Sequence, residues 1–271
     1  MDGQDSARHG GTHRVQSLVR GLAVITAFGE HAPELTLSEV ARATGLTRAA
    51  ARRFLLTLSD LGYVRSDGRY FSLTAKVLEL GYSYLSSMSL PEVAQPHLER
   101  LSTEVGESSS VSVLDGTDIV YVARVAVSRI MTVAINVGTR FPAHATSMGH
   151  VLLAGLDERA LREYLEVAPL ERITPHTITR PEALRAELTT VRDQGWALVD
   201  QELEEGLRSL AAPIRGRGGA VVAAVNVSSH ASRASLESMR QTMLPRLRDC
   251  AARIEADLAV TASAHRHPAG S

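Results

Sequence analysis

The stretch TLSEVARATGLTRAAARRFLLTLSDLGYVRSDGRYFSL, residues 36–73, decides the fold of the N-terminal part of this chain. Thr36 and Glu39 stand at the spacing of a capping box, which predicts that a short helix begins there. Gly45 stands where a left-handed residue ends such a helix, and Thr47 can cap a following one. Two helices joined by a short, glycine-containing turn form a helix-turn-helix.

The second of these helices carries an apolar and a polar face. Its apolar residues recur at helical spacing, which predicts a buried stripe. The stripe consists of Ala51, Phe54, Leu55, Leu58 and Leu61. Arg48, Ala49 and Arg52 fall on the opposite face, at the end that such a motif points toward base edges. Because arginine is the most common reader of guanine and a small alanine permits close approach, we expect these three residues to contact bases.

A basic hairpin follows the second helix. Asp67-Gly68 is a strong two-residue turn signal, and the residues on either side can pair as short strands. Arg65 and Arg69 bracket this tip, and we expect them to contact phosphates together with Arg53. With an amphipathic helix predicted at residues 15–28, the segment forms a winged helix-turn-helix. The candidate DNA-binding residues are Thr47, Arg48, Ala49, Arg52, Arg53, Arg65 and Arg69.

The charge distribution agrees with this interpretation. Residues 42–76 contain seven basic and two acidic residues, a net charge of +5 within a chain whose net charge is −1. A local basic patch is typical of a phosphate-binding surface. An arginine-rich face that meets only solvent would carry the same charge, but the order of helices followed by a basic hairpin favours double-stranded DNA as the partner.

Length and composition indicate a globular protein with room for two domains or one large one. The chain has 271 residues, of which 44% are hydrophobic and 22% charged. No apolar run approaches the ~20 residues of a membrane span, and the polar N-terminus lacks the apolar core of a signal peptide. Cys250 is the only cysteine, which excludes an intrachain disulfide and a cysteine-based metal cluster within one chain. We expect a cytoplasmic protein without a metal, a cofactor or a membrane partner.

The rest of the chain alternates strands and helices. Helical spacing between Leu73 and Tyr84 predicts a linker helix, and from Ser108 the apolar period changes to two, as in strands. Strands are predicted at 108–114, 119–125, 130–137, 196–203 and 220–227, with a link at 206–219, and helices at 91–105, 146–154, 157–166, 181–194 and 235–259. Strands with helices on their faces make an α+β domain.

Three separated motifs resemble one protein family. GLTR at 45–48, RFLLTL at 53–58 and GYV at 62–64 resemble the winged helix of IclR-type transcription regulators. GTRFPAHATSMG at 138–149 resembles the segment that opens that family's effector-binding domain, and Gly195-Trp196, Asp200 and GLRSLAAPI at 206–214 resemble its second signature. The implied segments are a disordered leader at 1–13, a winged helix-turn-helix at 14–73, a linker helix at 74–90, a GAF-like effector-binding domain at 91–260 and a disordered tail at 261–271.

The resemblance also implies a function. Segments 121–124, 129–131 and 142–149 look most like the branch that regulates aromatic-acid catabolism through protocatechuate, 4-hydroxybenzoate and the β-ketoadipate route. We therefore expect a sequence-specific DNA-binding regulator whose operator binding responds to a small organic acid. One helix-turn-helix covers a half-site, so we expect a homodimer, or a tetramer, on a palindromic operator. Leu56 leans outward and packs either in that dimer or under its own wing.

The effector site is expected around residues 144–149. Thr146 or Ser147 can cap the apolar helix that follows, and free N–H groups at a helix N-terminus attract a carboxylate. His144 adjoins this N-terminus and can donate a hydrogen bond, whereas plain capping without a ligand is the alternative interpretation. The resemblance places Leu207 and Ser209 in the pocket. The candidate effector-binding residues are His144, Ala145, Thr146, Ser147, Met148, Gly149, Asp200, Leu207 and Ser209.

One face of the strand predicted at 196–203 carries two acidic side chains beside the apolar Trp196 and Leu198. Asp200 and Glu202 are unusual there unless they are partnered or face a cavity. We expect Asp200 to accept a hydrogen bond from a ligand hydroxyl group, as in a hydroxybenzoate. A structural ion pair with Arg208 or Arg124 is the alternative and is favoured for Glu202. Arg124 and Arg129 either bind a carboxylate or lie on the surface.

Two other functions compete with this interpretation. Asp200, Glu202, His144 and Ser147 could serve as acid/base or nucleophilic groups of an enzyme. The sequence contains no Gly-x-Ser-x-Gly elbow, no phosphate-cradling loop with lysine and no His-Glu-x-x-His motif, so we expect no enzyme and no catalytic residues. A regulator that senses only a protein partner would show no thermal shift with any small acid.

Overall fold

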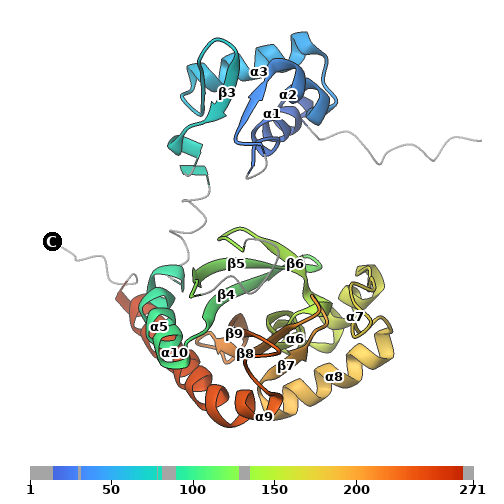
Figure 1. Ribbon diagram of the computed structural model, residues 1–271, viewed down its shortest axis with the longest axis vertical. Coiled ribbons are helices and arrows are strands. Elements are labelled where there is room, and N and C mark those ends of the chain that lie inside the picture. The colour runs from blue at the N-terminus through green and yellow to red at the C-terminus, as the bar shows by residue number, and fades with distance from the viewer. Residues whose placement is uncertain (1–14, 30–31, 78, 81–89, 128–134, 265–271) are drawn as a thin grey trace, which may run out of the picture. The chain divides into compact units, whose positions relative to one another are not determined.

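The computed structural model describes residues 15–29, 32–77, 79–80, 90–127 and 135–264. Its contacts divide the chain into two compact units, residues 1–86 and 87–271. Figure 1 labels many of the elements of both units. The leader expected at 1–13 lies outside the described residues.

The N-terminal unit combines helices with a small antiparallel sheet. Its elements are α1 (Gln16–Thr26), β1 (Glu34–Thr36), α2 (Leu37–Thr44), α3 (Arg48–Asp60), β2 (Val64–Ser66) and β3 (Tyr70–Leu73). Strand β3 lies between β1 and β2. Sequence patterns do not predict β1, because a three-residue strand shows no clear alternation. The helices followed by the β2–β3 hairpin confirm the predicted winged helix-turn-helix.

Capping side chains set the ends of α2 and α3. The backbone N of Thr36 donates to Oε2 of Glu39 at 2.8 Å, and the backbone N of Glu39 donates to Oγ1 of Thr36 at 3.4 Å, which is the predicted capping box. Gly45 ends α2 with a φ of 66°, in the left-handed region that favours glycine. Thr47 caps α3 by accepting a hydrogen bond from the backbone N of Ala50 at 3.2 Å. These caps fix the turn between the two helices.

The core of the N-terminal unit follows the predicted stripe of α3 except at its end. Ala51 and Leu55 are fully buried, together with Val24 and Val40. Leu61, expected in the stripe, is 53% exposed. The reason is that α3 ends at Asp60 and Leu61 is already its C-cap residue.

The wing turns one residue later than predicted. Ser66 pairs with Phe71, and the backbone N of Asp67 donates to the carbonyl oxygen of Tyr70 at 3.2 Å. The two central residues of the turn are therefore Gly68 and Arg69. Gly68 has a φ of 99°, which suits a glycine at the first central position of a hairpin turn.

Most residues of the predicted linker helix are not among those that the structure describes. Residues Ala75–Val77 form the short 3-10 turn η1, and residues 79–80 are helical. Residues 78 and 81–89 lie outside the described residues, so the linker helix at 74–90 stays a prediction.

Within its described residues, the C-terminal unit is an antiparallel sheet with the strand order β6-β5-β4-β9-β8-β7 and helices on both faces. The strands are β4 (Ser108–Asp115), β5 (Asp118–Val125), β6 (Arg140–Pro142), β7 (Ala197–Asp200), β8 (Leu207–Arg215) and β9 (Val221–His230). The helices are α5 (Leu90–Val105), η2 (Ala143–Ala145), α6 (Ser147–Ala154), α7 (Glu158–Val167), α8 (Pro181–Gln194), α9 (Leu236–Ser238), the π turn η3 (Met239–Met243) and α10 (Leu244–Ala264). This architecture confirms the expected α+β, GAF-like domain.

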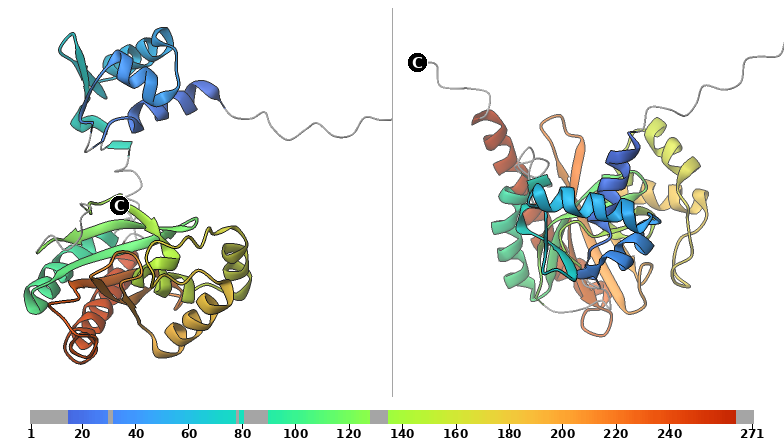
Figure 2. Two further views of the ribbon diagram at one scale, coloured as in Figure 1. Left: turned by 45° about the vertical axis from the view of Figure 1, so that its right-hand side comes forward. Right: turned by 90° about the horizontal axis from the view of Figure 1, so that it is seen from above.

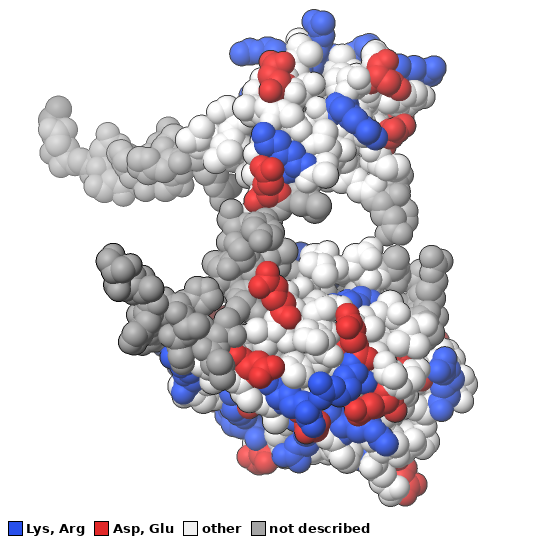
Figure 3. Space-filling model, turned by 90° about the vertical axis from the view of Figure 1, so that its left-hand side faces the viewer, with Lys and Arg blue, Asp and Glu red and all other residues white. Residues whose placement is uncertain are grey.

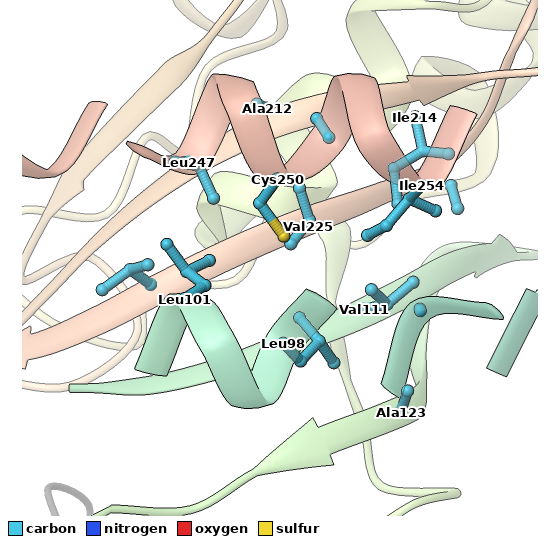
Figure 4. Close-up of a cluster of buried hydrophobic side chains, with 14 of the residues drawn as sticks. Leu98, Leu101, Val111, Ala123, Ala212, Ile214, Val225, Leu247, Cys250 and Ile254 are labelled. Carbon is cyan, nitrogen blue, oxygen red and sulfur yellow. The ribbon is translucent and has the colours of Figure 1, made fainter. Parts of the chain in front are cut away.

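Two separate cores lie on the two faces of this sheet. Helices α5 and α10 lie side by side over one face, and α6 packs on the other with α7 and α8 (Figures 1 and 2). Figure 4 shows Leu98 and Leu101 of α5 approaching Leu247, Cys250 and Ile254 of α10 over the strands. Successive strand residues point to opposite faces, so neighbouring residues in one strand belong to different layers.

The structure corrects the strand predictions at two places. Residues 206–219, expected to be a link, contain the nine-residue strand β8. Alanine and proline have low β-propensity, but pairing with β7 and β9 and burial outweigh it here. Pro213 is tolerated because β7 pairs only with residues 208–211 and does not reach it. Of the strand predicted at 130–137, residues 130–134 lie outside the described residues, and 135–137 are not a strand.

The last helix is longer than predicted and contains a π turn. Pro245 lacks an N–H group and would clash with the preceding turn of a regular α-helix, and the π turn Met239–Met243 stands just before it. Helix α10 then continues to Ala264. Residues 261–264 are therefore helical, whereas the prediction assigned them to a disordered tail.

Candidate DNA interface and ligand pocket

Helix α3 presents its N-terminal arginines to solvent. Arg48, Ala49, Arg52 and Arg53 are all exposed, and the hydroxyl oxygen of Thr47 is engaged in capping the helix. Figure 3 shows Lys and Arg side chains projecting from the surface of this unit. Exposed arginines at the start of the second helix of a helix-turn-helix suit insertion into the major groove.

Local contacts hold the wing arginines. Nε of Arg65 donates to Oγ of Ser72 at 3.0 Å, and the guanidinium of Arg69 lies 5.2 Å from the ring centre of Tyr70. The carboxylate of Asp67 accepts hydrogen bonds from the backbone N atoms of Tyr70 and Arg69, and these bonds lower its pKa. Both guanidinium groups are exposed on this ordered tip, where they suit contacts with a phosphate backbone.

A pocket lies between the N-terminus of α6 and the sheet of the C-terminal unit. The space inside it, with its opening to solvent included, is about 350 Å³. Its lining residues are Tyr121, Ala145, Thr146, Ser147, Met148, Val199, Leu203, Leu207, Ser209, Asn226 and Ser228. Six of the nine candidate effector-binding residues meet in this pocket, namely residues 145–148, Leu207 and Ser209.

The first turn of α6 forms one wall of the pocket. Oγ1 of Thr146 accepts a hydrogen bond from the backbone N of Gly149 at 3.0 Å and so caps the helix as predicted. The backbone N–H groups of Ser147 and Met148, at the first two helical positions, have no acceptor within the helix. Together with the helix dipole they make this wall favourable for a negative charge.

Buried polar side chains form the opposite wall. Oγ of Ser209 lies 2.7 Å from Oγ of Ser147 and 3.3 Å from Oγ of Ser228. Nδ2 of Asn226 donates to Oγ of Ser209 and to Oγ of Ser228, each at 3.0 Å. Sequence reasoning missed Asn226 and Ser228. The sequence held one signal for them. Asn226 and Ser228 stand two positions apart near the end of the apolar strand β9, and polar residues at every second position indicate a strand face that meets a cavity.

Three of the nine candidate effector-binding residues do not line the pocket, and His144 and Gly149 are two of them. His144 is 1% exposed, and its Nε2 lies 3.0 Å from the carbonyl oxygen of Glu171. Gly149 packs so closely on the preceding turn that an added Cβ would lie 1.9 Å from the carbonyl oxygen of Ala143. The structure therefore corrects both predictions: His144 holds the segment around Glu171, and Gly149 permits a close backbone contact.

Asp200 also lies outside the pocket, on the other face of the sheet. Its Oδ1 accepts a hydrogen bond from Nε of Arg208 at 2.7 Å. Leu198 packs in the layer of α5 and α10, whereas Val199 lines the pocket. Since residues 198 and 200 share a strand face, Asp200 cannot meet a ligand there. The structure contradicts the predicted contact with a ligand hydroxyl and shows the alternative, an ion pair with Arg208.

Glu202 is buried in a different setting from the one predicted. Strand β7 ends at Asp200, and Gln201 has a φ of 65°, so Glu202 does not continue the strand face. Its carboxylate accepts a hydrogen bond from the backbone N of Ile178 at 3.3 Å. Burial raises the pKa of Glu202 to about 7, against the effect of this hydrogen bond. Arg208, one of the two expected partners, is paired with Asp200 instead.

We expect the substitution Glu202→Gln to change how stability depends on pH. The fold raises the pKa of Glu202 from 4.5 to about 7, so the folded chain binds this proton more tightly than the unfolded chain. The resulting stabilisation is complete below the unfolded pKa and is lost as the pH rises through the folded one. Glutamine still accepts from Ile178 but cannot ionise, so the variant should melt above the natural chain at about pH 8. Melting curves of both proteins at several pH values measure this difference, and parallel profiles would rule it out.

Arg124 lies half-buried on β5, close to the lining residue Tyr121. Its Nη1 donates to Oγ of Ser110 at 3.2 Å, and its Nε has no hydrogen-bond partner among the described residues. Burial holds the pKa of Arg124 below its usual value. A desolvated guanidinium of this kind is suited to an anion. Arg129, the other candidate for a carboxylate, lies outside the described residues.

Among the described residues, no group of His, Cys, Asp and Glu side chains could hold a metal ion. In the same part of the chain, no helix has the length and apolar character needed to cross a membrane.

The chain is similar in sequence to curated transcription regulators along most of its length. The chain is 50% identical over 230 residues to the Pca regulon regulatory protein of Pseudomonas putida, covering 84% of this chain and 79% of the relative. It is 39% identical over 242 residues to the p-hydroxybenzoate hydroxylase transcriptional activator of Acinetobacter baylyi, covering 88% and 89%.

Solved structures give the same result. A transcriptional regulator of Rhodococcus sp. RHA1 superposes with a TM-score of 0.84 at 62% identity, covering 92% of this chain and all of that one. An IclR homolog of Microbacterium hydrocarbonoxydans in complex with 4-hydroxybenzoate superposes with a TM-score of 0.81 at 28% identity, covering 90% and 99%.

Family models cover both units. The IclR helix-turn-helix domain matches residues 17–68, and the C-terminal domain of bacterial IclR transcriptional regulators matches residues 82–256. These matches confirm the resemblance of the three sequence motifs. The chain therefore belongs to the IclR family and is a DNA-binding transcription regulator rather than an enzyme.

Proposed function

We propose that this regulator binds its operator through α3 and the wing, under the control of a small aromatic acid in the pocket. The observation that carries the proposal is the make-up of the pocket: the first turn of α6 lines it together with a network of serine and asparagine side chains. An acid with a second polar group matches both walls. The Microbacterium homolog in complex with 4-hydroxybenzoate and the Acinetobacter activator named for p-hydroxybenzoate hydroxylase support an aromatic acid.

The proposed DNA contacts follow from exposure and position. Arg48, Ala49 and Arg52 read base edges in the major groove, with Thr47 beside them at the helix start. Three further arginines bind phosphates, namely Arg53 of α3 and Arg65 and Arg69 of the wing. A DNA partner places this activity in the cytoplasm.

The regulator is proposed to act as a homodimer on a palindromic operator. Helix α1 and its N-cap residue Val15 support this because they expose an apolar stripe at helical spacing, with Val15 64%, Leu18 63% and Leu22 51% exposed. Large apolar stripes on a surface usually mark an interface. Leu56 is 46% exposed, so it does not pack under its own wing and is available to the same interface.

The carboxylate of the effector is proposed to lie at the N-terminus of α6. The N–H groups of Ser147 and Met148 and the helix dipole stabilise a negative charge there. Arg124 is the second candidate, since its Nε has no partner among the described residues. The uncharged methyl ester of an effector would lose affinity in either case.

Melting temperatures of the full chain test the proposed effector class. A ligand that binds only the folded state stabilises it by about 2.7 kcal/mol at a concentration of 100 times its Kd. We expect 4-hydroxybenzoate, protocatechuate or β-ketoadipate to raise the melting temperature in a concentration-dependent manner. Ser209→Leu fills the pocket and should abolish the shift, while Thr190→Leu, on the exposed face of α8, should keep it. The proposal fails if none of these acids shifts the natural chain.

A further inference from the structure

Asn226 is a buried polar side chain of the pocket with an unused hydrogen-bonding atom. The residue is 3% exposed on β9 and lines the pocket. Its Oδ1 is buried and has no hydrogen-bond partner among the described residues. Buried polar atoms are almost always paired, and an exception at the wall of a pocket indicates a group that a ligand completes.

The surrounding network explains why this atom is left over. Nδ2 of Asn226 is held by two serines, Ser209 and Ser228, at 3.0 Å each. Ser209 is in turn bonded to Ser147 at 2.7 Å, so the serine hydroxyls are used within the network. The amide is therefore held at its Nδ2 end by two serines, while its Oδ1 end is buried and unpaired in a side chain that lines the pocket.

The chemical nature of the unpaired Oδ1 of Asn226 determines which ligand group can bind it. An amide oxygen accepts hydrogen bonds, so a carboxylate oxygen, which also only accepts, is repelled from it. A hydroxyl group can donate a hydrogen bond to it. The negative charge of an acid and its hydroxyl group thus belong at different places in the pocket, the charge away from Asn226 and the hydroxyl against it.

We propose that Asn226 is a specificity-determining residue that accepts a hydrogen bond from a hydroxyl group of the effector, so that the pocket selects hydroxylated acids over the same acids without the hydroxyl. This inference rests on the proposed function, because it assigns the group recognised within the same pocket. Asn226 takes the role that the sequence suggested for Asp200. A site that hydrogen-bonds a ligand hydroxyl discriminates strongly against the analogue without that hydroxyl, because binding the analogue leaves a buried protein group unpaired.

The test is the binding of two acids that differ only in the hydroxyl group. Titration calorimetry of the full chain with 4-hydroxybenzoate and with benzoate should give at least a tenfold lower Kd for the hydroxylated acid. Asn226→Leu, of similar size but without polar atoms, should reduce this ratio to about twofold, mainly by weakening 4-hydroxybenzoate. Asn226→Thr keeps a hydroxyl in the wall and should retain part of the ratio. Ligand-free melting curves establish that each variant is folded.

The chain provides a matched control in its other asparagine. Asn136 is exposed, and Asn136→Leu should keep the ratio of the natural chain. Equal affinity of the natural chain for both acids, or an unchanged ratio in both Asn226 variants, overturns the inference and leaves the proposed effector class standing. If neither acid binds, and protocatechuate and β-ketoadipate also fail, the proposed function and the inference fall together.

Discussion

The variant Gly149→Ala is expected to lose roughly 3 kcal/mol or more of stability in the C-terminal unit. A Cβ at this position would lie 1.9 Å from the carbonyl oxygen and 2.5 Å from the Cα of Ala143, so the backbone itself must move. Every residue of α6 is buried, so the helix cannot shift without disturbing a packed layer. The substitution would also displace the first turn of α6, which forms one wall of the pocket.

Thermal unfolding followed by circular dichroism measures this effect against a matched glycine. Gly218→Ala is the control, because a Cβ there meets no atom within 4 Å and its backbone has no positive φ. The control should melt close to the natural chain and Gly149→Ala far below it. Similar melting temperatures for the two variants would show that α6 accommodates the methyl group.

The second large effect is expected from Arg48→Ala in the DNA-binding unit. If Arg48 pairs with a guanine, its removal should weaken operator binding by ~1–3 kcal/mol, or roughly five- to 150-fold, and relax the base preference at one position. Arg53→Ala is the matched comparison on the same helix. As a phosphate contact, Arg53 should contribute about equally to operator and random DNA, and its loss should lower the salt slope by about one.

Fluorescence anisotropy with an operator selected from a random DNA pool by the natural chain separates these two roles. Each variant is titrated with the selected sequence and with a scrambled one at several salt concentrations. Equal losses on both sequences for Arg48→Ala would make it a phosphate contact and refute the base-reading role.

Local chemistry made most of the helices predictable. The caps Thr36, Gly45 and Thr47 act within a few residues of the chain, so their pattern fixes the helix ends without tertiary information. Strand β8 was missed for the opposite reason. Its alanines and Pro213 have little intrinsic tendency to form a strand, and the pairing with β7 and β9 that stabilises it comes from distant parts of the chain.

The ligand pocket was predictable on one side only. The segment around Thr146 and Ser147 carries a helix-capping signal, so its place at a helix N-terminus could be read locally. Asp200 was misplaced because alternation shows which residues share a strand face but not which face meets a cavity. Asn226 joins the pocket from a strand far along the chain, and only the sheet brings it to α6.

The single thiol provides a native reporter of the layer shown in Figure 4. Cys250 is 5% exposed between α5 and α10, and burial raises its pKa to about 12, so it should resist thiol reagents while the layer is closed. No other cysteine competes for the reagent. The rate of labelling therefore measures how often α10 separates from α5, and a change in this rate when a ligand is added would report coupling between the two faces of the sheet.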